Sequence, residues 1–157
     1  MIRIERLDSK DVYKASKFAQ SIMNSTSIYN KKCRQRDSKE LSPDNLRKAM
    51  KYGVLFVAKN KDGKIIGFAD YYPSDSGVVY LNWVFVDNSF RRKGLGTALL
   101  KRLLVSAKKH GEHSIWTEIL ADNYKSINLI KKIGFKKIGL FKKAWYKQDY
   151  YLWYKNI

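Results

Sequence analysis

The chain has 157 residues, of which 32 are Lys or Arg and 14 are Asp or Glu, so its formal net charge is +18 at pH 7. Hydrophobic residues make up 45% of the sequence and aromatic residues 14%, which excludes an intrinsically disordered chain even at this charge. The length fits one domain over residues 1–157. The longest apolar run, Val54–Ala58, is far too short to cross a membrane, so no membrane partner is expected.

Cysteine content and charge distribution limit the expected cellular location and the expected binding partners. Cys33 is the only cysteine, and the first six residues carry charges where a signal peptide needs an apolar stretch, so we expect a cytoplasmic protein. Two histidines and one cysteine are too few for a typical zinc site, so no metal is expected. The cations are spread along the chain, which favours a solvated basic surface; a nucleic acid or ribosome partner is the alternative. Whether the chain forms a homodimer is left open.

The first third of the chain predicts one strand and two helices. Residues 2–7 alternate apolar and charged side chains, as a half-buried strand does. Residues 12–23 repeat apolar side chains at helical spacing after a capping segment. The segment 24–40 is polar, then basic, and has no clear period, so it predicts a loop or a short irregular helix. Ser-Pro-Asp at 42–44 begins the next helix, which ends near Gly53.

The rest of the chain predicts alternating strands and helices. Asp62-Gly63 supplies the turn of a β-hairpin. The remaining elements are strands 54–59, 64–72, 78–86 and 114–120, helices 94–110 and 122–133, and strands 135–145 and 149–154. The order βααβββαβαββ predicts an α/β (α+β) fold with a sheet of mixed direction.

The most informative stretch is 84–96, where an uncharged strand leads through a turn and three cations (91–93) into a long helix that carries Gly94 and Gly96. Glycines let phosphate oxygens approach the backbone, first-turn N–H groups are free donors, and the helix dipole adds partial positive charge. The pattern therefore predicts a pyrophosphate site. It is neither a Walker loop nor a dinucleotide fingerprint. The alternative is that both glycines only permit a tight turn and close packing.

Two segments carry a family resemblance. Arg91-Arg92-Lys93-Gly94-Leu95-Gly96 matches the signature Arg/Gln-x-x-Gly-x-Gly/Ala, and residues 123–135 resemble Asn-x-x-Ala/Ser-Ile-x-Leu-Tyr-x-x-x-Gly-Phe. With both in register, the chain resembles the GNAT superfamily of acetyl-coenzyme A-dependent N-acetyltransferases over nearly its whole length. It is most similar to the branch that acetylates ribosomal-protein alanine and protein N-termini.

This resemblance implies a mostly antiparallel sheet with splayed central strands, flanked by helices. It also implies transfer of an acetyl group from acetyl-CoA to a primary amine, by direct attack through a tetrahedral intermediate. The residues implied to bind the cofactor are Val84, Phe85, Val86, Arg91, Arg92, Lys93, Gly94, Leu95, Gly96, Thr97, Asn123 and Ser126. The side chains of residues 84–86 can at the same time be core, because the implied contacts are main-chain. Asn123 can equally cap its helix.

The resemblance also implies the catalytic groups. Glu118 lies where ribosomal-protein alanine acetyltransferases carry a glutamate base, and apolar neighbours at 116 and 119 should raise its pKa. The alternative is a surface glutamate on an edge strand. Tyr80 lies where some relatives place a catalytic glutamate or tyrosine; the alternative is a buried structural tyrosine. Ile130 replaces the tyrosine that commonly gives a proton to the departing thiolate.

Because Ile130 cannot donate a proton, another group must substitute for it. The candidates are Tyr124, Tyr146, Tyr80 or water.

Trp145-Tyr146 is the candidate binding site for the acceptor. These residues lie between the last two strands, close to where N-terminal acetyltransferases place a tyrosine pair that holds the substrate peptide. The alternative for these aromatic residues is sheet packing. A chain this basic repels polyamines and aminoglycosides, so we expect a peptide or protein amine as acceptor. The alternatives are a small-molecule amine acetyltransferase, or a basic nucleic-acid or ribosome-associated binding module on the same fold.

Overall fold

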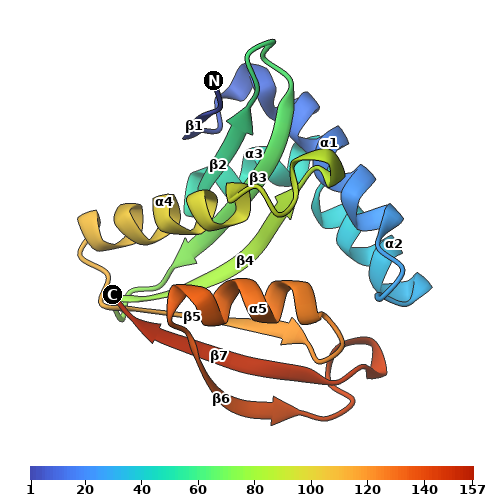
Figure 1. Cartoon of the computed structure of the whole chain (residues 1–157), viewed down its shortest axis with the longest axis vertical. Coiled ribbons are helices and arrows are strands. Elements are labelled where there is room, and N and C mark those ends of the chain that lie inside the picture. The colour runs from blue at the N-terminus through green and yellow to red at the C-terminus, as the bar shows by residue number, and fades with distance from the viewer.

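The computed structural model describes all residues, 1–157, and is built on one seven-stranded sheet of order β1-β2-β3-β4-β5-β7-β6 (Figure 1). Only the β4–β5 pair is parallel, and the other five are antiparallel, which confirms the mixed, mostly antiparallel sheet. The strands are β1 (Arg3–Arg6), β2 (Val54–Lys59), β3 (Ile65–Pro73), β4 (Val78–Val86), β5 (Ser114–Leu120), β6 (Lys136–Phe141) and β7 (Tyr150–Asn156).

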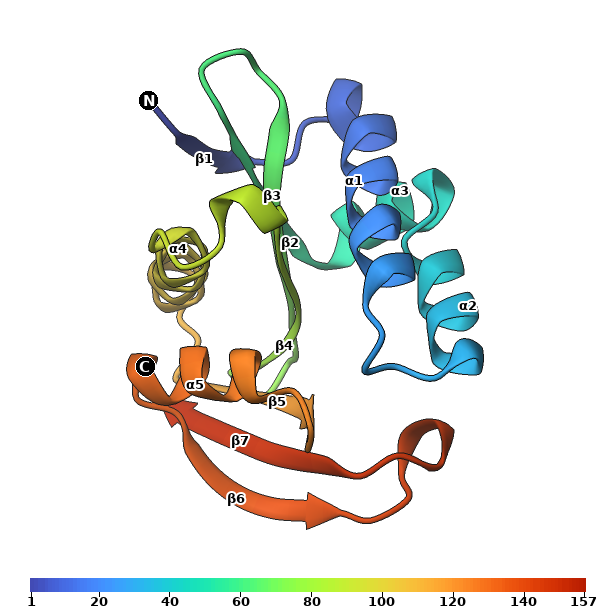
Figure 2. The same ribbon diagram turned by 45° about the vertical axis from the view of Figure 1, so that its right-hand side comes forward.

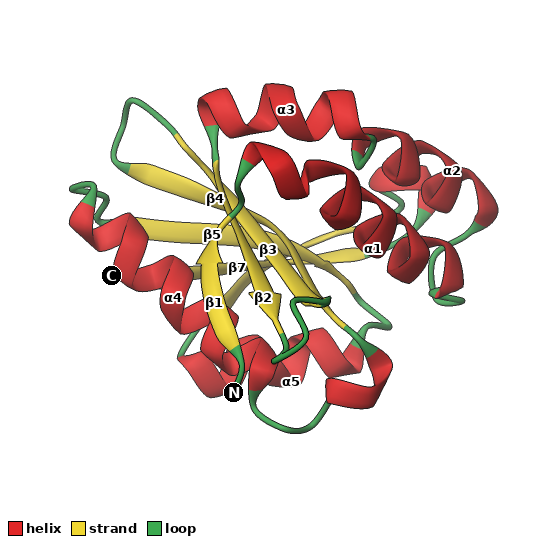
Figure 3. Cartoon of the chain, turned by 90° about the horizontal axis from the view of Figure 1, so that it is seen from above, coloured by secondary structure: helices red, strands yellow, loops and turns green.

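Helices cover both faces of the sheet (Figure 3). The helices α1 (Val12–Ser25), α2 (Lys31–Glu40) and α3 (Pro43–Tyr52) lie on one face, and α4 (Leu95–Lys109) and α5 (Tyr124–Ile133) lie on the other. Short 3-10 turns are η1 (Ser9–Asp11), η2 (Asn88–Phe90) and η3 (Trp145–Lys147). None of the helices is long and apolar enough to cross a membrane.

The centre of the sheet opens where β4 and β5 diverge. Their parallel pairing covers only three residues on each strand, ending at Tyr80 opposite Trp116. Beyond that pair β4 continues with β3, while β5 continues with β7, so the two halves of the sheet turn away from each other (Figure 2). The splayed central strands expected from the family resemblance are therefore present.

Two hydrophobic clusters lie on opposite faces of the sheet. The larger, with 19 buried residues, packs α4 and α5 against the sheet, and Leu99, Leu103 and Ile115 are completely buried in it. The smaller, with 13 buried residues, packs α1 and α3 against β2 and β3 around Phe68 and Met23. The alternation of side chains along each strand decides which cluster a residue joins.

Local signals in the sequence begin and end the elements as expected. The Ser42 hydroxyl accepts from the Asn45 N–H at 3.4 Å, and Pro43 occupies the first helical position of α3. The β2–β3 turn has Gly63 at φ +78°, the left-handed conformation that this hairpin requires. Lys108 and Lys109 close the last turn of α4.

The expected element order lacks one helix, because residues 31–40 form the regular helix α2. Its N-cap is Asn30, whose side chain accepts from the Cys33 N–H at 2.9 Å. Cys33 is the only buried residue of α2, so the helix has no repeated apolar positions that periodicity can detect. Contacts to neighbouring elements hold it instead, such as the bond from the Gln20 side chain to the Ser38 carbonyl at 2.8 Å. The fold class stands, and the order becomes βαααβββαβαββ.

Candidate functional site

The free edge of β4 exposes main-chain groups at the centre of the sheet. The Asp87 N–H donates to the Ile66 carbonyl of β3 at 2.9 Å. In an antiparallel pair the main-chain groups alternate between the two edges, so those of Val84 and Val86 point away from β3, where no strand pairs with them. The main-chain groups of Phe85 point toward β3, and its side chain is buried in the smaller cluster. Of residues 84–86, Val84 and Val86 therefore direct main-chain groups to the open edge, where the Val86 carbonyl accepts from the Arg91 side chain, and Phe85 is core.

The loop between β4 and α4 is a run of unpaired donors. Six successive N–H groups, from Arg92 to Thr97, donate no hydrogen bond within the chain. Gly94 has φ +84°, a left-handed conformation that costs other residues energy, and its carbonyl accepts the first helical bond, from Ala98. Consecutive amides at a helix N-terminus form a concave binding site for an anion.

Gly96 lies at a tight crossing between elements. A Cβ atom there would lie 3.1 Å from a methyl carbon of Leu129 on α5 and 3.7 Å from Val86 on β4. Gly96 therefore does permit close packing of α4 against its neighbours. It is compatible with anion binding, because the neighbouring N–H groups remain free.

Three cationic residues belong to the same loop as these amides. The side chains of Arg91, Arg92 and Lys93 are exposed. The Arg91 Nε donates to the Val86 carbonyl at 3.1 Å, and the Lys93 ammonium lies 5.7 Å from the centre of the Phe90 ring. Full positive charges thus add to the partial charge of the helix N-terminus.

Asn123 caps α5, as its alternative interpretation proposed. Its side-chain oxygen accepts from the Ser126 N–H at 3.2 Å. The same side chain interacts with the hydroxyl of Tyr29, a residue between α1 and α2 that the sequence did not single out. Burial raises the pKa of Tyr29 to about 12, and the hydrogen bond with Asn123 opposes this shift.

Glu118 and Tyr80 share the face of the sheet that carries α1–α3. Strand β5 lies between β4 and β7 in the sheet, but at Glu118 it pairs only with β7, because β4 has already separated from it. Burial raises the pKa of Glu118, and a hydrogen bond from Trp145 opposes the rise. Tyr80 is half-buried with its ring centre 4.8 Å from that of Trp116, and burial, followed by the charge of Glu118, raises its pKa.

The connection between β6 and β7 reaches α2 from the other half of the molecule (Figure 2). The Tyr146 hydroxyl donates to Asp37 of α2 at 2.8 Å, and the Asn30 side chain donates to the Tyr146 carbonyl at 2.9 Å. Trp145 donates to Glu118 and is 52% exposed, so sheet packing does not describe it. Tyr146 has φ +56°, an unfavourable conformation that these hydrogen bonds help to hold.

The candidates for the proton donor have different surroundings. Ile130 is 3% exposed and packed in the larger cluster. Tyr124 is 67% exposed at the start of α5, and Tyr146 is engaged with Asp37. Tyr80 is half-buried and lies next to Glu118.

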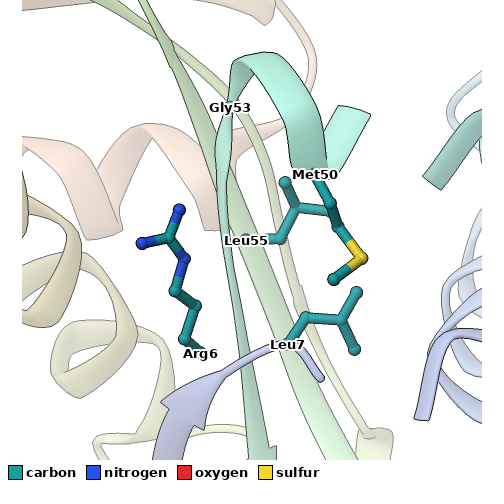
Figure 4. Close-up of a pocket in the computed structure, with 5 residues that line it drawn as sticks. All are labelled: Arg6, Leu7, Met50, Gly53 and Leu55. Atoms are coloured by element: carbon teal, nitrogen blue, oxygen red, sulfur yellow. The ribbon is translucent and has the colours of Figure 1, made fainter. Parts of the chain in front are cut away.

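A small pocket elsewhere contains none of the candidate residues. It is lined by Arg6, Leu7, Met50, Gly53 and Leu55, from the region of β1, α3 and β2 (Figure 4). No cluster of three or more His, Cys, Asp or Glu side chains arranged to bind a metal ion is present. The candidate site remains the region that joins the open edge of β4, the start of α4 and Glu118.

Comparison with known proteins decides the family. The family model described as "Acetyltransferase (GNAT) family" matches residues 19–135, most of the chain. The chain belongs to the acetyltransferase (GNAT) family. The matched region runs from α1 past the unpaired amides to the end of α5, so it contains the candidate groups on β4, α4 and β5.

Individual relatives of this GNAT chain differ in their acceptors. The ribosomal protein bS18-alanine N-acetyltransferase of Escherichia coli is 37% identical over 54 residues, which are 34% of this chain and 36% of that protein. The L-methionine sulfoximine/L-methionine sulfone acetyltransferase of Pseudomonas aeruginosa is 32% identical over 90 residues, or 54% and 52% of the two chains. The matches thus span between about a third and a half of these curated relatives.

A solved structure matches over the full length. The PaiA N-acetyltransferase of Thermoplasma acidophilum, solved in complex with coenzyme A, has a TM-score of 0.83. The alignment covers 100% of this chain and 99% of that one, at 17% identity, and so establishes the fold alone.

Proposed function

We propose that this GNAT chain, as one catalytic domain over residues 1–157, transfers the acetyl group of acetyl-CoA to the primary amine at a peptide or protein N-terminus. The observation that carries the proposal is the run of six unpaired N–H groups from Arg92 to Thr97, with Arg91 beside it. A diphosphate is the ligand that such an array fits best, because its oxygens accept from several donors and its charge matches the cations.

Other residues extend the cofactor site. Residues 91–97 would hold the diphosphate, and the main-chain groups of Val84 and Val86 would pair with the amides of the pantetheine arm as an added strand does. Asn123 and Ser126 at the start of α5 would flank the arm. When bound there, acetyl-CoA supplies an activated acyl group to an incoming amine.

Glu118 is proposed as the base. An acceptor amine is mostly protonated at neutral pH, and its proton must leave before nitrogen can form a bond to the acyl carbon. Burial raises the pKa of Glu118, which makes its carboxylate a better proton acceptor than an exposed one. The proton moves to Glu118 directly or through a water molecule.

Tyr80 is proposed as the donor of a proton to the departing thiolate. It lies beside Glu118 on the same face, whereas Ile130 has no proton to give and Tyr124 extends into solvent. A tyrosine hydroxyl is protonated at neutral pH, and the raised pKa of Tyr80 keeps it protonated in alkaline solution as well. The Tyr146 hydroxyl is committed to Asp37, which favours a role in holding the loop and the acceptor.

The acceptor is proposed to bind next to Trp145 and Tyr146. The carboxylates of Glu118 and Asp37 lie on this side, so a cationic amine meets local negative charge despite the basic surface. The relative that acetylates an alanine of a ribosomal protein supports a peptide acceptor. The relative that acts on methionine derivatives keeps a small amine as the second candidate.

The direct experiment measures CoA release from acetyl-CoA with the wild-type chain and a panel of acceptors. The panel contains peptides with N-terminal Ala, Ser or Met, the same peptides with a blocked N-terminus, and L-methionine sulfone. Acetyl-CoA is expected to raise the melting temperature, and only free N-terminal peptides are expected to turn over rapidly. Faster turnover of L-methionine sulfone would overturn the peptide assignment. Salt-dependent binding to RNA without any effect of acetyl-CoA would overturn the enzyme.

A further inference from the structure

A buried carboxylate on β3, that of Asp70, has no part in the chemistry proposed above. It is 1% exposed and forms no ion pair. One oxygen accepts from the Trp83 N–H at 2.8 Å, and the other accepts from the Asn82 side chain at 3.1 Å, both on β4. Burying a carboxylate without a counter-ion is costly, so its hydrogen bonds must be structurally or functionally important.

These bonds coincide with an irregularity in β4. Asp70 lies opposite Trp83, and the next residue, Tyr71, lies opposite Leu81, so Asn82 is an extra residue that forms a β-bulge. The bulge leaves the Trp83 N–H facing the Asp70 side chain, which replaces a main-chain acceptor.

The bulge and the splay of the sheet occupy the same place. Tyr80 is the last residue of β4 that pairs with β5. The hydroxyl of Thr117 on β5 donates to the Leu81 carbonyl at 2.8 Å, and the strands separate beyond this contact. Two side chains, Asp70 from β3 and Thr117 from β5, therefore hold β4 at the point where it leaves its neighbour.

We propose that Asp70 is a positioning residue whose carboxylate fixes the bulge at Asn82, and through it presents Val84 and Val86 to the pantetheine arm of CoA. Without the extra residue, the register of the strand beyond it shifts by one. A one-residue shift exchanges the two edges and faces of a strand, so Val84 and Val86 would turn toward β3 and Phe85 would face the open edge.

The sequence contains a trace of this role. Asp70 is the only charged residue of β3, in the segment Ile-Ile-Gly-Phe-Ala-Asp-Tyr-Tyr-Pro. Burial raises its pKa to about 6, while Asn82, the Trp83 N–H and Tyr72 stabilise the charged form. The inference rests on the proposed function, because it assigns Asp70 an effect on CoA binding.

The test exchanges the two polar partners. In Asp70→Asn, the new amide at position 70 faces the amide of Asn82. In Asn82→Asp, the new carboxylate at position 82 faces the carboxylate of Asp70. The double variant Asp70→Asn/Asn82→Asp restores one carboxylate and one amide with their roles exchanged. Asp75→Asn, in the exposed β3–β4 turn, is the matched control.

Calorimetric titration with CoA is the primary readout. We expect the Kd to rise about tenfold or more in each single variant and to return to within about threefold of wild type in the exchange variant. The KM for acetyl-CoA should rise in parallel. Loss of folded protein alone would lower the apparent kcat and leave KM unchanged. The control should bind CoA as the wild type does.

Wild-type CoA affinity in Asp70→Asn would overturn the inference, and so would a folded exchange variant that binds no better than the weaker single variant. If the variants at 70 and 82 do not fold, Thr117→Val removes the hydrogen bond to the Leu81 carbonyl, the second contact that holds β4 at this point. A weakened CoA affinity in this variant supports the role of the splay in CoA binding. An unchanged CoA affinity overturns that role. A wild-type chain that fails to bind CoA would contradict the proposed function instead.

Discussion

The indole N–H of Trp145 donates a hydrogen bond 2.5 Å long to the carboxylate of Glu118. The two residues are 27 positions apart, one in the β6–β7 connection and the other on β5. Burial raises the pKa of this carboxylate and the indole lowers it, so the loop proposed to adjoin the acceptor also affects the basicity of the proposed base. In the proposed reaction, an incoming ammonium group would share this carboxylate with the indole.

Replacement of Trp145 should therefore shift the pH dependence of the reaction. Trp145→Phe removes the donor that lowers the pKa of Glu118, so that pKa rises. Because Glu118 must be deprotonated to accept a proton, the acidic limb of kcat/KM against pH is expected to move to higher pH. In a Glu118→Gln background the same change should leave the pH profile unaltered. A shift to lower pH in the single variant would contradict the assignment.

Glu118 itself should affect turnover and not cofactor binding. Glu118→Gln keeps the shape of the side chain and removes the base, so kcat is expected to fall by about 100-fold or more. The Kd for CoA should stay within about twofold of wild type, since no cofactor contact is assigned to this side chain. Glu40→Gln on the exposed surface of α2 is the control. Equal losses in kcat and CoA affinity would argue against a role as base.

The start of α4 can be tested by charge and by size separately. Gly96→Glu places a carboxylate among amides and cations proposed to bind a diphosphate, and CoA affinity is expected to fall by about 100-fold or more. Gly96→Ala adds only a Cβ, 3.1 Å from a flexible Leu129 methyl group, and should retain most of the affinity. Calorimetry measures both. Retained CoA binding in Gly96→Glu would refute the diphosphate site.

A buried ion cluster near the N-terminus should contribute to stability. The Lys59 ammonium lies 2.7 Å from Asp11 and 2.5 Å from Glu5, and it is shielded from solvent. Asp11→Asn removes one partner and is expected to lower the free energy of unfolding by about 2 kcal/mol in urea titrations. Asp44→Asn, which breaks an exposed pair with Arg47, should change it by less than about 0.5 kcal/mol.

The same cluster has a defined pH dependence. Hydrogen bonds to Asp11, then to Glu5, raise the pKa of Lys59 above its ordinary value of 10.5. A raised folded-state pKa stabilises the fold below the ordinary value, and this stabilisation is lost as pH rises through the folded-state value. As the pH rises into the strongly alkaline range, the difference in stability between wild type and Asp11→Asn should therefore shrink.

Local sequence signals located most of the fold. Caps at Ser42 and Asn123, the Gly63 turn and the periodicity of α1 and α4 all depend on neighbours a few residues away. The segment of α2 was predicted only as a loop or a short irregular helix, because contacts with α1 and with the β6–β7 connection hold this helix and no local pattern records them. Helices that lack an apolar stripe are difficult to recognise for this reason.

The candidate site likewise combines features that depend on local sequence with features that depend on residues distant in the chain. The unpaired amides at 92–97 follow from a local motif, and their position was predictable from the sequence. The bond from Trp145 to Glu118 and the bulge beside Asp70 join residues 27 and 12–13 positions apart, and they require the register of the sheet. The main-chain orientation that separates Phe85 from Val84 and Val86 depends on that bulge, so it could not be derived from alternation alone.

The single sulfhydryl of the chain is shielded from chemical labelling. Cys33 is fully buried, its Sγ donates to Asp37, and burial followed by the Asp37 charge raises its pKa to about 12. Alkylating and disulfide-exchange reagents react with the thiolate, so the folded protein should be inert to them. Any labelling of Cys33 then reports opening of α2, and the protein contributes no background when such reagents are used to follow free coenzyme.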